Sequence, residues 1–166
     1  MAVLMRFNND CGVAVVATVT DQPYEKVRDL WPGKFRGDIS DSLIHHQGVL
    51  SRLGFRYKTR SVEDVIADRC EPRKTAILLN AQNDPETFLR EDLLIMHWVV
   101  LDLVKDGVIW VHWMDGTRKP FVFDSFRKHM TNPFSVAYEV YEGWFDMPWY
   151  KRLYKRITSW IGSLWS

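Results

Sequence analysis

The first third of the chain consists of apolar segments at helical spacing, separated by short polar breaks. Residues 13–20 are apolar but rich in β-branched side chains, so burial must stabilise any helix that they form. A second helix is predicted to begin around Pro23, which suits a first helical turn. A third is predicted from about Ser40 to Gly54, where apolar residues recur every three or four positions. The pattern therefore predicts an N-terminal layer of helices.

From residue 55 onward the pattern changes to alternation and short apolar runs, which are typical of strands. Asp106-Gly107 between two apolar runs is a strong hairpin signal. Helices followed by neighbouring antiparallel strands predict an α+β fold. Strands are expected at 55–59, 75–79, 97–104, 108–114, about 121–123 and 135–141, with a short capped helix over 61–67, a polar loop over 80–93 and a helical turn over 125–130.

The last twenty positions, residues 147–166, have the pattern of a separate amphipathic helix. Its apolar face carries three aromatic residues, and four basic residues lie together on the opposite face: Lys151, Arg152, Lys155 and Arg156. This pattern predicts a division into a domain over 1–146 and a C-terminal helix over 147–166. Basic residues opposite tryptophan and leucine are typical of a helix in a membrane interface. The alternative is that residues 149–165 dock on the domain's own sheet or on a partner protein.

Composition places the chain among ordinary globular proteins of one domain. Its 166 residues carry a net charge of +1, with 46% hydrophobic and 26% charged residues, so there is no general argument for nucleic-acid binding. The two cysteines, Cys11 and Cys70, are too few for a disulfide framework and favour a reducing compartment. The N-terminus lacks the layout of a signal peptide, and no apolar run approaches the roughly 18 residues that span a bilayer. A cytoplasmic protein is expected, either free or peripheral at the inner face of a membrane.

The candidate nucleophile is Cys11, in the sequence Asp10-Cys11-Gly12 before the first apolar helix. Asp10 is a good N-cap residue, which would place the thiol at the positive end of the helix dipole. A thiolate is favoured there, and the thiol pKa falls below its usual value of about 8.5. Gly12 allows a substrate or backbone to approach closely. A buried structural cysteine is the alternative, because free cysteine is among the most buried residue types.

A thiolate nucleophile needs a base and a group that orients the base. His97 stands at the start of a predicted strand, and a two-residue hairpin loop places it opposite Gly116, beside Asp115. Asp124 is the alternative acid, but it ends the next strand, roughly 20 Å from His97 at about 3.4 Å per residue. The register therefore favours Asp115. Taken singly, His97 is also compatible with a half-buried strand position and Asp115 with a turn.

The set of motifs resembles a known family. Asp10-Cys11-Gly12 opens an apolar helix, His97-Trp98-Val99-Val100-Leu101 forms a strand, and Asp115-Gly116 ends the next strand. This order resembles the leader-peptide-cleaving peptidase domains of bacteriocin exporters, a branch of the papain-like cysteine proteases. The resemblance covers roughly residues 5–140. It implies a papain-like fold, with helices packed on an antiparallel sheet. It also implies a Cys11–His97–Asp115 triad that hydrolyses a peptide or protein through a thioester acyl-enzyme. No cofactor or metal is expected.

The sequence differs from that family at three points. Met5 stands where a glutamine six residues before the nucleophile helps to form the oxyanion hole, so Asn8 or Asn9 is the candidate side-chain donor. Losing one such donor costs about 10²–10³ in rate. Gly116 replaces a proline, and no transporter segment follows, so a free-standing domain is expected. The alternatives are an inactive papain-like binding module, or a thiol isopeptidase or acyltransferase that uses the same triad.

Overall fold

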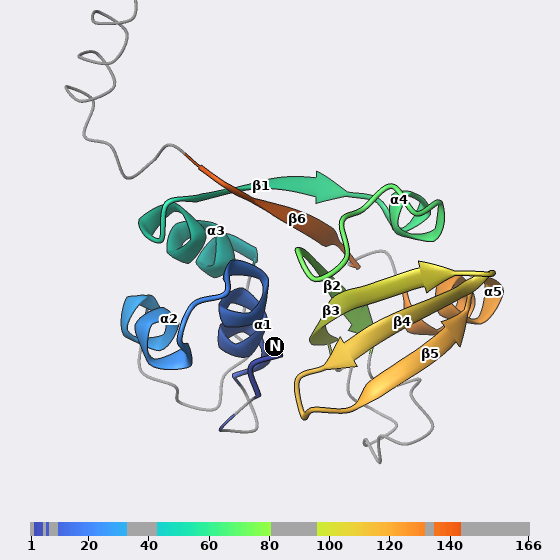
Figure 1. Cartoon of the computed structure of the whole chain (residues 1–166), viewed down its shortest axis with the longest axis horizontal. Coiled ribbons are helices and arrows are strands. Elements are labelled where there is room, and N and C mark those ends of the chain that lie inside the picture. The colour runs from blue at the N-terminus through green and yellow to red at the C-terminus, as the bar shows by residue number, and fades with distance from the viewer. Residues whose placement is uncertain are drawn as a thin grey trace, which may run out of the picture.

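The N-terminal part of the chain forms a layer of three helices (Figure 1). The structure is a computed structural model that describes residues 2–4, 6, 10–32, 43–80, 96–131 and 135–143. Every residue of α1 except Thr18 is buried, which explains how a segment of poor helix formers is helical. The three helices are α1 (Cys11–Thr20), α2 (Tyr24–Leu30) and α3 (Leu43–Arg52).

The rest of the fold is an antiparallel sheet of six strands in the order β1-β6-β2-β3-β4-β5. Together with the helical layer it confirms the predicted α+β class. The first strand, β1, forms one edge of the sheet. The last strand, β6, pairs with both β1 and β2. The strands are β1 (Phe55–Arg60), β2 (Thr75–Asn80), β3 (Met96–Lys105), β4 (Val108–Trp113), β5 (Arg118–Val122) and β6 (Ala137–Glu142).

Short helices lie between strands, as predicted. The helix α4 (Val62–Ile66) begins with a capping box, in which the Ser61 hydroxyl accepts the Asp64 N–H at 3.0 Å and the Asp64 carboxylate accepts the Ser61 N–H at 3.4 Å. After β5 the chain forms α5 (Phe123–Ser125) and η2 (Phe126–Met130). The predicted polar loop over 80–93 lies almost entirely outside the described residues.

The sheet is covered on both faces, so β3 is buried on both sides. On one face α1 packs against β2 and β3, and α3 packs against β1. We call the side chains enclosed there the helix-side core, and those on the other face the far-side core. The helix-side core includes Cys11, Val13, Val16, Val27, Leu50, Trp98, Val100, Met114 and Tyr138. The far-side core includes Ile77, Leu79, Val99, Leu101, Ile109, Val111, Trp113, Phe126 and Met130.

The hairpin between β3 and β4 has the predicted turn and one irregularity. Lys105 lies opposite Val108, as predicted, and Gly107 has a φ of +78°. A bulge between Leu101 and Leu103 then shifts the register by one residue. The residue at the bulge is the buried Asp102, whose carboxylate accepts the Arg118 Nε–H at 2.6 Å and lies 3.1 Å from His112 Nε2.

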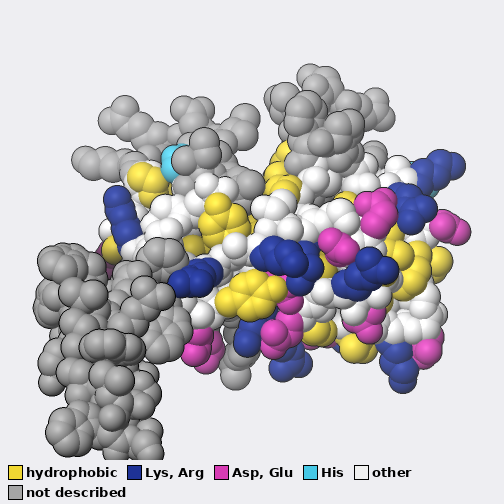
Figure 2. All heavy atoms as spheres, turned by 90° about the horizontal axis from the view of Figure 1, so that it is seen from above, with side chains coloured by type: hydrophobic (Ala, Val, Ile, Leu, Met, Phe, Trp, Pro, Cys, Tyr) yellow, Lys and Arg dark blue, Asp and Glu magenta, His cyan; other side chains and the backbone are white. Residues whose placement is uncertain are grey.

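Charges of both signs are interspersed on the face seen from the side of β1 (Figure 2). Among the described residues of this face, neither sign forms an extended surface. No helix among the described residues has the length and apolar character needed to cross a membrane. The predicted C-terminal helix over 147–166, and with it the proposed division at residue 146, lies outside the described residues.

Candidate active site

Cys11 is the first residue of α1. Only 8% of its surface is exposed, and it belongs to the helix-side core. The backbone carbonyl of Asp10 accepts the Ala14 N–H at 3.1 Å, so the helical hydrogen bonds begin directly at the cysteine. A thiol at this position lies at the positive end of a ten-residue helix, which favours its thiolate.

Asp10 occupies the predicted N-cap position, but its side chain does not cap the helix. The fully buried carboxylate instead accepts hydrogen bonds from the Tyr24 hydroxyl and, at 3.1 Å, from the Arg6 N–H. The expected local cap is wrong because a buried tyrosine hydroxyl needs an acceptor, and a carboxylate is the strongest one nearby. Burial, followed by the hydrogen bond to Asp10 and its negative charge, raises the pKa of Tyr24.

His97 lies at the start of β3, opposite Leu79 on β2, and is half-buried. Its imidazole stacks on Trp113, with the ring centroids 5.0 Å apart and the planes at 27°. The alternation of side chains along β3 directs the next residue, Trp98, into the helix-side core with Cys11. The same alternation turns His97 to the opposite face, where Trp113 of the far-side core restricts the orientation of the imidazole.

Asp115 lies in the exposed turn between β4 and β5. Its Oδ1 accepts the Thr117 N–H at 2.8 Å and the Thr117 hydroxyl at 2.7 Å, as expected of a turn-forming aspartate. Beyond the bulge the last pair is Val99 with Trp113, one residue away from the predicted register, because the bulge was not foreseen. The strand β4 ends there, and Met114 and Asp115 lie in the turn, so the strand pairing does not reach His97.

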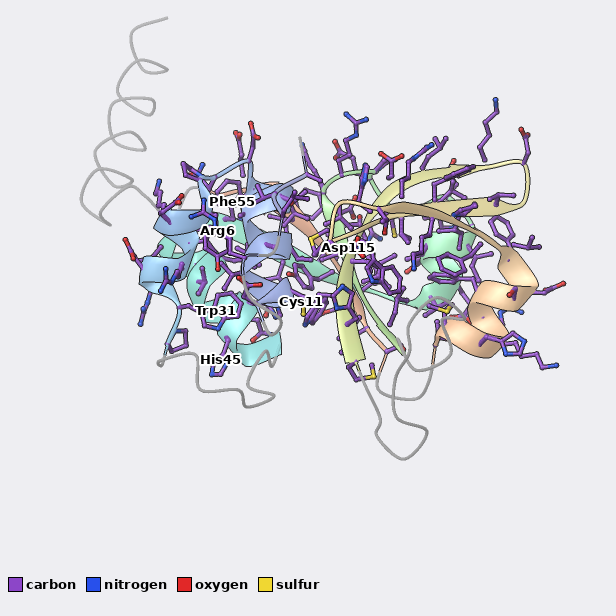
Figure 3. The ribbon with its side chains drawn as sticks, turned by 90° about the horizontal axis from the view of Figure 1, so that it is seen from below. Arg6, Cys11, Trp31, His45, Phe55 and Asp115 are labelled. Carbon is purple, nitrogen blue, oxygen red and sulfur yellow. The ribbon has the colours of Figure 1, made fainter. Side chains whose placement is uncertain are left out.

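The helix α1, the strand β3 and the turn after β4 all contribute side chains to the helix-side core. Met114, which precedes Asp115, belongs to the helix-side core with Cys11 and Trp98. Figure 3 shows Cys11 and Asp115 where α1 meets the strands. The segment before Cys11 also contacts this turn, because a methyl group placed on Gly116 would lie 3.1 Å from Leu4 Cδ2.

The alternative acid, Asp124, lies at the other end of the hairpin. It is exposed in α5, and the preceding residue, Phe123, donates its N–H to the Gly107 carbonyl at 3.2 Å. From His97 to this turn the strand runs about eight residues, or roughly 27 Å. The structure therefore separates Asp124 from His97 along the full length of β3.

Two other expectations concern residues away from this region. Cys70 is buried against the far-side core, and burial raises its pKa to about 11, so it is less reactive than an ordinary thiol. The candidate oxyanion donors Asn8 and Asn9, and Met5, lie outside the described residues. Among the described residues no group of three or more histidine, cysteine or acidic side chains is placed to hold a metal ion.

Sequence reasoning missed the role of Tyr24. The Arg6 guanidinium lies over the Tyr24 ring, 4.5 Å from its centroid, and Arg6 Nη1 is 2.5 Å from Glu25 Oε1. The available signal was the hydroxyl itself, since a tyrosine on a buried helical face requires a polar partner.

No protein-family profile and no curated protein matches the chain. Its fold, however, is similar to two solved structures. One is a double-glycine-motif protease from an AMS/PCAT transporter in complex with its leader peptide, with 16% identity and a TM-score of 0.59 over 84% of this chain and 89% of that one. The other is the peptidase domain of Streptococcus ComA, a bifunctional ABC transporter involved in quorum sensing, with 16% identity and a TM-score of 0.61 over 83% and 95%. The chain therefore has the papain-like fold of double-glycine peptidase domains.

Proposed function

We propose that this chain is a cysteine peptidase in which Cys11 is the nucleophile, His97 the general base and acid, and Asp115 the group that orients His97. The observation that carries the proposal is the position of Cys11 at the start of a buried helix that packs against β3, the strand on which His97 lies. The fold shared with double-glycine peptidase domains supports the same reaction.

In the proposed reaction the Cys11 thiolate attacks the carbonyl carbon of a peptide bond and forms a C–S bond. The negative oxygen of the tetrahedral intermediate is stabilised by the Cys11 N–H, with Asn8 or Asn9 as the second donor. His97 has accepted the proton of the thiol and now gives it to the departing amine. The C–N bond breaks, and the acyl group stays on Cys11 as a thioester. Water then attacks the thioester while His97 accepts its proton, which releases the acid and restores the thiol. A peptide substrate is supported by the similar protease, which was solved with a leader peptide.

The rate of iodoacetamide labelling as a function of pH, followed for each cysteine by mass spectrometry, tests the nucleophile. We expect Cys11 to reach half its maximal rate below about pH 7, because it lies at a helix N-terminus and, in the proposed triad, pairs with the His97 imidazole. Cys70 is the internal control and should remain almost unlabelled there, since its pKa is about 11. Equal and slow labelling of the two cysteines at neutral pH would contradict the proposal.

The same measurement separates the two aspartates. Asp115→Asn should raise the labelling midpoint of Cys11, because the imidazolium that stabilises the thiolate loses its orienting charge. Asp124→Asn is the matched control: it is also exposed, but it lies at the far end of β3 and should have little effect. The reverse order of effects would assign the orienting role to Asp124.

An inactive binding module is the second candidate, and it is favoured by Met5 at the position where the resembling family has a glutamine. A peptide mixture incubated with the wild-type chain and with Cys11→Ala distinguishes the two candidates. New peptide termini that appear only with wild type support the peptidase. Retention of the same peptides by both proteins, with no new termini, supports the binding module.

A further inference from the structure

The segment before Cys11 is attached to the fold on three sides. The Val3 N–H donates to the Thr18 hydroxyl of α1 at 2.9 Å. Leu4 lies against the turn that contains Gly116. Arg6 reaches α2 through Glu25 and through the ring of Tyr24. Contacts with α1, α2 and the turn after β4 therefore fix the positions of Val3, Leu4 and Arg6.

Asp10 is the charged residue nearest to Cys11 in the sequence, and none of its surface is exposed. A carboxylate at an N-cap position ordinarily turns toward the N–H groups of the first helical turn. There its negative charge would lie close to the thiol and disfavour the thiolate. In the structure the hydroxyl of Tyr24, which is only 2% exposed, and the Arg6 N–H hold one carboxylate oxygen instead.

We propose that Tyr24 is a positioning residue for Cys11, which holds the Asp10 carboxylate away from the first turn of α1. The inference rests on the proposed function, since it assigns a role in making the thiol reactive. The other charged groups that act on the Tyr24 hydroxyl are Arg28 and Arg6, and Glu25 lies on the same helix and binds Arg6. Both arginines are cations, so they reinforce the placement of Asp10 beside Tyr24.

Tyr24→Phe tests the inference, because it removes the hydroxyl and keeps the ring. Asp10 then loses its side-chain donor and turns to the first N–H groups of α1, nearer to the thiol. We expect the pH midpoint of Cys11 labelling by iodoacetamide to rise by about one unit, the effect of a nearby like charge. Tyr57→Phe is the matched control, since Tyr57 also packs against the helix-side core but lies on β1, with its ring against Tyr138. It should leave the midpoint unchanged.

The same substitution in an Asp10→Asn background shows whether Tyr24 acts through Asp10. Because this background lacks the negative charge of Asp10, Tyr24→Phe should move the pH midpoint of Cys11 labelling by no more than a few tenths of a unit. A purely structural role would lower the melting temperature in both backgrounds without moving the midpoint. A shift of the same size in both backgrounds, or no shift in either, would overturn the inference.

If Tyr24→Phe does not fold, Asp10→Asn alone still tests the inference. The amide oxygen still accepts the Tyr24 hydroxyl, and the charge is gone, so the midpoint should stay or fall. A rise would overturn the inference. If wild-type Cys11 labels like an ordinary thiol, that result refutes the proposed function itself. A reactive wild-type Cys11 that Tyr24→Phe does not change refutes the positioning role alone.

Discussion

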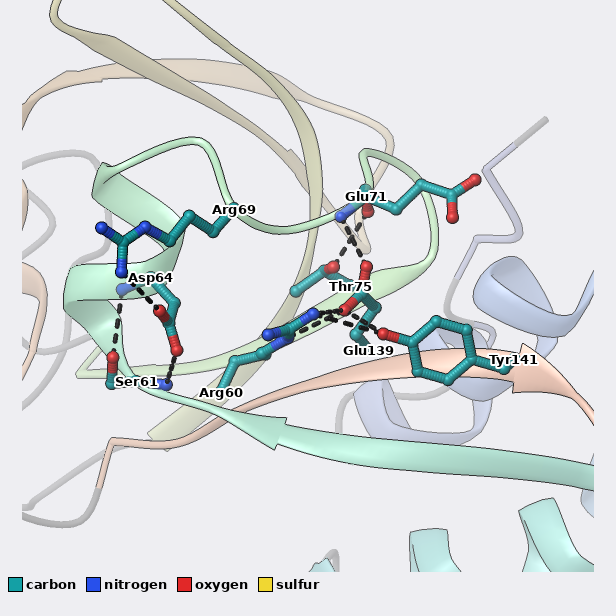
Figure 4. A network of polar contacts seen from close by, with 8 residues as sticks. All are labelled: Arg60, Ser61, Asp64, Arg69, Glu71, Thr75, Glu139 and Tyr141. Carbon is teal, nitrogen blue, oxygen red and sulfur yellow. Dashed lines mark hydrogen bonds and ion pairs between the residues drawn. The ribbon is translucent and has the colours of Figure 1, made fainter.

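At the scale of single residues, the described part of the chain contains a buried carboxylate with an unusually full set of donors (Figure 4). Glu139 on β6 accepts from the Arg60 guanidinium, the Tyr141 hydroxyl and, at 2.8 Å, the Glu71 N–H. Burial alone would raise the pKa of Glu139, but the hydrogen bonds from Tyr141 and Arg60 outweigh it and lower the pKa below its usual value. The network joins β1, β6 and the turn before β2.

Glu139→Gln should lower the free energy of unfolding by about 2 kcal/mol at pH 7, because hydrogen bonds to a charged group are lost within a buried site. Since the folded pKa lies below the unfolded value of about 4.3, the carboxylate stabilises the fold above that value. Its contribution is lost as the pH falls through the lower folded pKa, so the two proteins should converge in strong acid. Urea unfolding across pH measures the difference. The exposed Glu142→Gln is the control, and equal stability of wild type and Glu139→Gln at pH 7 would contradict the account.

At the scale of elements, local chemistry decided which features were predictable. The capping box of Ser61 and Asp64 and the turn at Asp106-Gly107 depend on neighbouring residues alone, and both were predicted. The bulge at Asp102 depends on His112 and Arg118 from other strands, so no local pattern revealed it.

The candidate site shows the same limit. The positions of Cys11 at a helix start and His97 at a strand start follow from hydrophobic patterning. The hydrogen bond between Asp10 and Tyr24 does not follow from this patterning, because Tyr24 reaches Asp10 only in the folded chain and there replaces the local cap. The one-residue shift in the pairing of β3 with β4 likewise came from one nonlocal bulge.

The same substitution, glycine to alanine, tests the assigned backbone conformation at two positions. Gly107→Ala should destabilise the protein by about 1 kcal/mol, since its φ of +78° strains any side chain although the surrounding space is open. Gly48→Ala lies in the interior of α3, also with open space around it, and should stabilise by about 0.5–1 kcal/mol. Urea midpoints of both variants check the signs. Effects of the same sign would contradict the assigned backbone conformations.

At the scale of the whole molecule, one sheet separates two cores, and the nucleophile belongs to the helix-side core. The order of helices and strands was predictable, because segments with helical spacing precede those with the alternation of strands. The order of strands within the sheet was not, since β6 pairs with residues 60 to 87 positions earlier through contacts that no local pattern encodes.

The sequence also predicts that residues 149–165 bind a membrane surface. Four cations near an anionic surface contribute roughly 4 kcal/mol before screening. Replacing Lys151, Arg152, Lys155 and Arg156 by glutamine should therefore abolish sedimentation with anionic vesicles, while the circular dichroism of the domain is retained. Neutral vesicles are the control, and they should bind wild type and variant equally weakly. An intact chain that ignores anionic vesicles, together with a lower melting temperature after truncation at Asp146, would instead indicate docking on the domain.

The position of β6 between β1 and β2 has a consequence for the order in which the chain is made. Until Glu142 has left the ribosome, both β1 and β2 have an edge with no strand beside it. Contacts across such sequence distances form slowly, and open edges recruit other chains. Arg56, Lys58 and Arg60 place one positive charge at every second position of β1, which repels another copy of the same edge. The basic residues of β1 thus disfavour pairing with a second copy until β6 is made.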